Sequence, residues 1–138
     1  MKVQAYLMFN GRTEEAIEFY KKALDAEVTA LMRFRDAPEP PPPGMIPQGW
    51  DDKVMHSSFR VGETELMASD GCQSDGAAFA GVSLSLSLAN AAEAEARFAA
   101  LSEGGTVTMP LGATFFASSF GMLTDRFGVS WMIVVSTL

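Results

Sequence analysis

Two helical segments lie about 78 residues apart in this chain, and each is surrounded by short extended segments. The first is expected to begin at Thr13, which can cap a helix. Apolar side chains then recur at three- and four-residue spacing and form one stripe. That stripe consists of Ala16, Ile17, Tyr20, Ala23 and Leu24. The pattern predicts a helix that lies on a sheet by one face.

The second helical segment starts at Asn90, which stands in for the usual Ser or Thr of a capping box completed by Glu93. Gly104 and Gly105 follow the apolar stripe and supply a left-handed stop. The stripe consists of Ala94, Phe98 and Leu101. This helix is also expected to cover a sheet.

Extended segments flank both helices and complete two similar modules. They are predicted at residues 3–9, 27–34, 54–60 and 64–69, and again at 82–88, 106–109, 115–123 and 130–136. With 138 residues and 48% hydrophobic content, the chain can bury one core but is too short for two ordinary independent domains. We therefore expect one α+β domain over 1–138, built from two βαβββ modules at about 1–70 and 80–138.

The charge balance limits the partners. Ten Lys and Arg against 17 Asp and Glu give a net charge of -7, which opposes nucleic acid and anionic membranes. The closest basic groupings, Lys21-Lys22 and Arg33 with Arg35, are too small for a nucleic-acid footprint. No apolar run is long enough to cross a membrane, and no export signal opens the chain. A single cysteine, Cys72, fits a reducing cytoplasm, which is the expected location.

Two loops are predicted from composition. Six of the seven prolines lie in residues 38–47, a segment read as a stiff connection or lid, with a ligand for a proline-recognition domain as the alternative. Residues 70–79 join the two modules and carry ordinary turn chemistry.

The segment 82–88 alternates strictly between an apolar residue and serine, so three leucines are expected on one face and Ser83, Ser85 and Ser87 on the other. Three serines without a charge favour a concave or crowded surface over a plain solvent-exposed one. The segment 130–136 is nearly all apolar, so both of its faces should be covered, with Met132 on the face opposite Trp131.

Few residues can support catalysis. The chain has one histidine and one cysteine, which excludes a structural zinc site, and it has no glycine-rich phosphate loop. His56 is the single unperturbed candidate for a base near neutral pH, although a structural role is the simpler interpretation. Glu65 is the best strand carboxylate. A nucleophile pair of Cys72 and His56 is a weaker alternative.

Four segments together resemble the PhnB-like proteins of the vicinal-oxygen-chelate (glyoxalase/bleomycin-resistance/dioxygenase) superfamily. They are residues 6–11 (YLMFNG), 15–20 (EAIEFY), 55–62 (MHSSFRVG) and 120–131, whose D-x-F-G-x-x-W ending is typical of that group. The resemblance implies an incomplete barrel of paired βαβββ modules around a metal and ligand cup. It also implies a homodimer.

Some relatives carry names suggesting phosphonate metabolism or ubiquinone methylation. This sequence has no methyl-donor glycine motif after a first strand and no phosphate-binding cluster of basic residues.

The resemblance also places the metal ligands of the superfamily. Those positions fall on Ala5, on Glu65 or Met67, on Ser83 and on Met132. At most one of the four offers a good donor to a divalent ion, so no metal and no other cofactor is expected.

The leading hypothesis is therefore a metal-independent protein that binds a small, partly apolar organic molecule in a concave cup. The predicted lining is Ser83, Ser85, Met132 and Phe116, with His56 and Glu65. One alternative is an enzyme of the same superfamily, of the lyase, isomerase or dioxygenase type, that uses His56 or Glu65 or a weakly held metal. A third is a structural dimer whose cup has filled with side chains.

Overall fold

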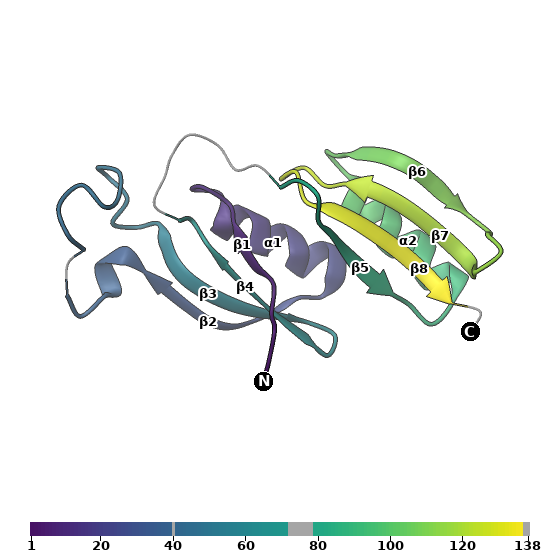
Figure 1. Cartoon of the computed structure of the whole chain (residues 1–138), viewed down its shortest axis with the longest axis horizontal. Helices are drawn as coiled ribbons and strands as arrows, with labels where there is room; N and C mark the ends of the chain where they lie inside the picture. Colours follow the sequence, from purple (N-terminus) through teal and green to yellow (C-terminus); the bar gives the residue numbers. More distant parts are fainter. Residues whose placement is uncertain (40, 72–78, 137–138) are drawn as a thin grey trace. The chain divides into compact units, whose positions relative to one another are not determined.

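The computed structural model describes residues 1–39, 41–71 and 79–136, and it divides into two compact units, Met1–Ala77 and Ala78–Leu138. The first unit contains β1 (Tyr6–Met8), α1 (Thr13–Leu24), β2 (Glu27–Arg33), the short 3-10 helix η1 (Phe34–Asp36), β3 (Val54–Val61) and β4 (Thr64–Ser69). The second contains β5 (Ser83–Ser87), α2 (Ala91–Ser102), β6 (Thr106–Gly112), β7 (Ala117–Thr124) and β8 (Ser130–Ser136) (Figure 1).

The two units share one topology. The strand order is β1-β4-β3-β2 in the first sheet and β5-β8-β7-β6 in the second. In each sheet the first strand pairs in parallel with the last, and the other pairs are antiparallel. The predicted repeat of two βαβββ modules is confirmed. Neither four-stranded sheet closes on itself, because its two edge strands are not paired with each other.

Aromatic side chains join α1 to the first sheet. Tyr20 stacks on Phe59 of β3 with ring centroids 6.0 Å apart and planes at 15°, and Phe9 packs against the same tyrosine. All five residues of the predicted stripe on α1 are buried. Burial of such a stripe is the main source of stability for a helix this short, because isolated helices of twelve residues are marginal in water.

The start of α1 differs from the prediction. Thr13 does not cap the helix: it is the first helical residue, and its buried hydroxyl has no hydrogen-bond partner. The cap comes instead from Asp70, 57 residues away, whose Oδ1 accepts from the backbone N–H groups of Gly11 and Thr13 at 2.9 and 2.8 Å. Its Oδ2 accepts from Val54 N at 2.7 Å. Asp70, which the sequence placed in a turn, therefore links the start of α1 to β3 and to the end of β4.

In the second unit, α2 begins and ends nearly as predicted. Asn90 Oδ1 accepts from Glu93 N at 2.9 Å, and Gly104 has the left-handed φ of +76° just beyond the helix. Gly105 serves a different purpose, because a Cβ atom there would lie 2.2 Å from the carbonyl oxygen of Thr124. The second glycine thus allows the chain to pass close to the end of β7.

The turn between β7 and β8 is organised by Asp125, which is buried. Its Oδ1 accepts from the N–H groups of Phe127 and Val129 at 2.9 and 3.0 Å, and its Oδ2 accepts from Trp131 Nε1 at 2.9 Å. Gly128 has φ of +91° within this turn. The D-x-F-G-x-x-W ending is therefore a structural motif, in which the aspartate holds a turn.

Candidate functional site

Each sheet has one face covered by its own helix and one face that this helix leaves uncovered, which we call the helix-free face. In the second sheet, Trp131, Ile133 and Val135 are buried towards α2, so alternation places Ser130, Met132 and Val134 on the helix-free face. The cross-strand pairs Met109–Met122, Met122–Met132 and Met132–Ser85 then form one row across all four strands. Three thioether side chains and a serine hydroxyl share this row.

The serines of β5 lie along the edge of that face. Ser83, Ser85 and Ser87 are all exposed, and Ser83 Oγ is 2.6 Å from Ser130 Oγ on the neighbouring strand. The predicted alternation in this strand is confirmed, although its leucines are only half-buried. Small hydroxyl side chains beside methionines give a surface with little bulk and several hydrogen-bonding groups.

Phe116 lies just before β7, whereas the sequence predicted it within the strand. The hydroxyl of Thr114 accepts from the N–H groups of Phe116 and Ala117, which makes a turn at this point. The ring of Phe116 packs edge-on against Phe120, with centroids 5.1 Å apart. Phe120 pairs with Val134 and so belongs to the helix-free face. Phe116 therefore extends the apolar part of that face beyond the strand end.

The first sheet repeats this arrangement with different side chains. Its central row runs Tyr6, Met67, Ser58 and Ala30 across β1, β4, β3 and β2. His56 shares the face and pairs with Met32. Met8 lies beside the row, opposite Ser69.

Tyr6 and His56 form a hydrogen-bonded pair on this face. Tyr6 Oη lies 2.8 Å from His56 Nδ1, and the two ring centroids are 5.6 Å apart. Burial raises the pKa of the Tyr6 hydroxyl above its ordinary value, with an opposing effect from a hydrogen bond with Ser69. At neutral pH Tyr6 is therefore a protonated phenol, which can donate to Nδ1 of His56 when that nitrogen carries no proton. Sequence reasoning missed Tyr6. Side chains alternate along β1, and the apolar Leu7 points towards the helix, so the neighbouring Tyr6 could have been assigned to the helix-free face.

His56 and Glu65 share a face but do not meet. Glu65 pairs with Arg60, four residues along β3 from His56, which corresponds to roughly 13 Å along a strand. The Glu65 carboxylate instead accepts from Gln4 Nε2 at 3.3 Å and Thr29 Oγ1 at 3.4 Å. An acid-base dyad of these two residues is therefore absent, and Tyr6 takes the place beside His56.

The six predicted lining residues thus fall into two groups, each on the helix-free face of one unit. His56 and Glu65 belong to the first, and Ser83, Ser85, Met132 and Phe116 to the second. Cys72, the weaker nucleophile candidate, lies outside the described residues.

The donor set at the superfamily's metal positions does not suit a divalent ion. Ala5 and Met67 offer no hard donor, the Glu65 carboxylate already accepts two hydrogen bonds, and Ser83 is engaged with Ser130. Within residues 1–39, 41–71 and 79–136, no group of three or more His, Cys, Asp and Glu side chains could hold a metal ion. We therefore derive no chemistry through a metal at these positions.

The whole chain has clear relatives. The model of the 3-demethylubiquinone-9 3-methyltransferase family matches residues 1–134. The chain belongs to this family. A protein from Pseudomonas aeruginosa, PA1353, is 45% identical with a TM-score of 0.83, covering 99% of this chain and 98% of that one. A PhnB protein from Bacillus cereus is 30% identical with a TM-score of 0.80, covering 99% and 100%.

A sequence comparison supports the same assignment. Protein YjdN from Escherichia coli K12 is 34% identical over 142 residues, which cover 98% of this chain and 95% of YjdN. The PhnB-like resemblance inferred from four short segments is confirmed.

The superfamily fold is confirmed as well. A glyoxylase/bleomycin resistance/dioxygenase domain from Frankia has a TM-score of 0.61 at 15% identity, covering 99% of this chain and 97% of that one. In the part of the chain that the structure describes, neither helix has the length and apolar character needed to span a membrane.

Proposed function

We propose that this family member binds a small, partly apolar organic molecule on the helix-free faces of its sheets, without a metal. One observation carries the proposal: six of the nine methionines lie on these two faces. They are Met8, Met32 and Met67 in the first sheet and Met109, Met122 and Met132 in the second. Unbranched thioether side chains adapt to varied apolar shapes and are common on surfaces that bind several ligands.

The polar groups beside the methionines are few and well placed, which is the composition of small-molecule sites. In the second unit they are the hydroxyls of Ser83 and Ser85. In the first unit, the bond to Tyr6 orients the His56 ring, and with Tyr6 as the donor the Nε2–H group of His56 can donate to a ligand. The net charge of -7 favours a neutral or cationic ligand over an anionic one at these faces.

Exposed apolar side chains on the second unit support the same proposal. Phe115 is 99% exposed, Met109 44% and Phe116 39%. Contiguous apolar surface of this kind on a small protein marks a place where a ligand or partner binds.

The test is a screen of neutral and cationic fragments by ligand-observed NMR with chelator present, followed by two tryptophan variants. Ser83→Trp should abolish binding to the second face, because it fills a surface now lined by small side chains. Glu95→Trp, on an exposed position of α2, is the matched control and should leave binding unchanged. Unchanged affinity in Ser83→Trp would remove this face from the proposal.

A second candidate function is acid-base catalysis, and the hydrogen bond between Tyr6 and His56 favours it. A histidine oriented by a phenol can exchange a proton at Nε2 with a bound substrate. If the hits of the fragment screen are turned over, the pH dependence of kcat/KM should be lost in His56→Ala. A profile that survives that substitution excludes the histidine from the chemistry.

The proposal includes a homodimer, which the resemblance implies. Analytical ultracentrifugation at micromolar concentration tests it directly. A mass near twice the monomer's 14.8 kDa supports the dimer, and a monomer across the concentration range removes it.

A further inference from the structure

A cavity lies in the first unit, at the N-terminal end of α1. It has a volume of about 370 Å³, within the range of small-molecule sites. None of its lining residues belongs to the ligand faces described above. They are Gly11, Glu14, Arg33, Arg35, Asp52, Lys53, Val54 and Asp70.

Three cations line this cavity. Arg33 and Arg35 flank Phe34 at the start of η1, and the fold brings Lys53 to them from a position 18 residues further along the chain. The sequence showed Arg33 and Arg35 as a close pair but predicted no basic cluster. The structure corrects this, because three of the ten basic residues share one small cavity in an acidic chain.

Two of the three cations, Arg33 and Lys53, are held in place by backbone carbonyls. Arg33 Nη1 donates to the carbonyl of Asp52 at 2.8 Å, and Lys53 Nζ donates to the carbonyl of Gly11 at 3.0 Å. The N–H of Arg33 donates to Asp36 Oδ2 at 3.0 Å, which anchors its backbone. These bonds orient the charged groups without neutralising them.

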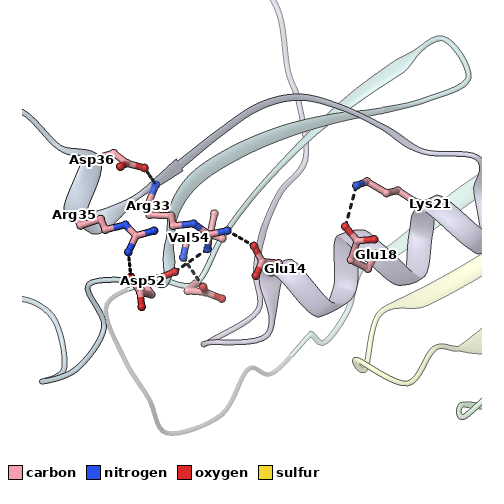
Figure 2. Close-up of polar contacts among 9 residues, drawn as sticks. Glu14, Glu18, Lys21, Arg33, Arg35, Asp36, Asp52 and Val54 are labelled. Atoms are coloured by element: carbon pink, nitrogen blue, oxygen red, sulfur yellow. Dashed lines mark hydrogen bonds and ion pairs between the residues drawn. The ribbon is translucent and has the colours of Figure 1, made fainter.

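The carboxylates that neutralise the two arginines are exposed. Figure 2 shows Arg33 reaching Glu14 on α1 and Arg35 reaching Asp52, the latter at 2.5 Å. The side chains of Glu14 and Asp52 are 54% and 75% exposed. Such exposed ion pairs are weak, so both carboxylates can turn towards water at little cost.

Asp70 is the third carboxylate of the cavity and cannot turn away. It is 1% exposed and accepts from three backbone N–H groups. When Glu14 and Asp52 turn away, the three cations face two anions, Asp70 and the Asp36 carboxylate that accepts from Arg33 N. The guanidinium groups of Arg33 and Arg35 are then without their carboxylates, and the local excess is one positive charge.

We propose that this cavity binds a small dianion whose two negative charges replace the Glu14 and Asp52 carboxylates on Arg33 and Arg35. Arginine forks match carboxylate and phosphate oxygens, so the group can be a dicarboxylate or a phosphate. The protein's net negative charge opposes an anion here as on the two faces, so the binding depends on the three cations that line the cavity.

The experiment follows the arginine Nε–H signals of the full chain by NMR while sodium succinate, sodium phosphate or sodium acetate is added at constant ionic strength. Succinate and phosphate supply the two candidate dianions, and acetate is the monoanion control. Four variants are compared: Glu14→Gln, Arg35→Gln, Glu18→Gln and Lys21→Gln. Glu18 and Lys21 form an ion pair at 2.8 Å further along α1, away from the cavity, and supply the matched charge controls.

The proposal predicts saturable shifts of Arg33 and Arg35 with a dianion, and weaker binding of acetate. Glu14→Gln should tighten dianion binding by up to about fivefold, because the competing carboxylate is gone. Arg35→Gln should weaken it by about tenfold. Glu18→Gln and Lys21→Gln should change it less than about twofold, since exposed pairs are weak.

Tighter binding of phosphate than of succinate identifies a phosphate-type ligand, and the reverse identifies a dicarboxylate. Equal responses in Glu14→Gln and Glu18→Gln would overturn the proposal, because the effect would then be general electrostatics. Equal binding of acetate and succinate would also overturn it. None of these variants touches the methionine-lined faces, so the result is independent of the proposed function.

Discussion

Tyr6 Oη lies 2.8 Å from Nδ1 of His56, so the single histidine of this chain is oriented by a phenol from another strand. Tyr6 is on β1 and His56 is on β3, and β4 lies between these two strands. Met67 of β4 pairs with Tyr6 on one side and with Ser58 of β3 on the other. The imidazole is thereby fixed, with Nε2 left as its other hydrogen-bonding atom.

The first prediction concerns the tautomer of His56. Because Tyr6 donates to Nδ1, the neutral ring should carry its proton on Nε2. Long-range ¹H–¹⁵N NMR spectra distinguish the two tautomers. Tyr6→Phe should return the ring to a mixture, and a wild-type ring protonated on Nδ1 would contradict the prediction, because Nδ1–H would then donate to Tyr6 Oη.

The raised pKa of Tyr6 predicts a loss of stability at alkaline pH. The unfolded protein ionises this tyrosine near pH 10, whereas the folded protein holds its proton to higher pH. The stabilising contribution is therefore fully present below about pH 10 and is lost as pH rises through the folded pKa. Denaturant unfolding at pH 8 to 11 should show a smaller decline in Tyr6→Phe, and identical declines would contradict the burial of this group.

Asp70→Asn should be strongly destabilising. An amide nitrogen in place of one carboxylate oxygen would face a backbone N–H donor, and the charge-assisted bonds would be lost. We expect a decrease in unfolding free energy of about 3 kcal/mol. Asp51→Asn changes an exposed side chain and should cost less than about 0.5 kcal/mol.

Asp125→Asn tests the turn motif of the family. Trp131 Nε1 should lose its acceptor or the backbone N–H groups of the turn should lose theirs, at a cost of about 2 kcal/mol. The indole N–H resonance of Trp131 reports the first outcome directly. A variant with wild-type stability would show that the motif is maintained for another reason.

Two glycines provide a matched steric test in the second unit. Gly105→Ala places a Cβ atom 2.2 Å from the Thr124 carbonyl oxygen, so we expect a loss of about 3 kcal/mol. Gly112→Ala, on β6, meets nothing within 4 Å and should be neutral or stabilising by about 0.5 kcal/mol. Thermal unfolding of both variants measures the difference, and equal melting temperatures would contradict the close approach.

The sequence predicted much of the fold because the signals it contains are periodic. Helical stripes at three- and four-residue spacing and the alternating segment 82–88 gave the elements, their faces and the repeat of modules. The resemblance added the incomplete barrel of paired modules, but the order of the strands in each sheet was not readable from one sequence and came with the structure.

The predictions failed where one side chain acts over a long distance. Asp70 caps a helix 57 residues away, and Lys53 joins Arg33 across the first unit. Local sequence patterns contain no information on such pairs. Tyr6 was missed for a simpler reason: the resemblance placed the metal-ligand position of this strand on Ala5, whose side chain points to the opposite face from that of Tyr6.

The central claim, metal-free binding of a small molecule on the methionine-lined faces, is tested most directly by methyl-labelled methionine NMR. The nine methyl signals are followed with chelator present while a hit from the fragment screen is added. We predict saturable shifts of Met122 and Met132, or of Met32 and Met67, with Met45 unchanged, and loss of the Met132 shift in Ser83→Trp. Shifts that appear only after a divalent metal is supplied, or that spread equally to Met45, would contradict the account.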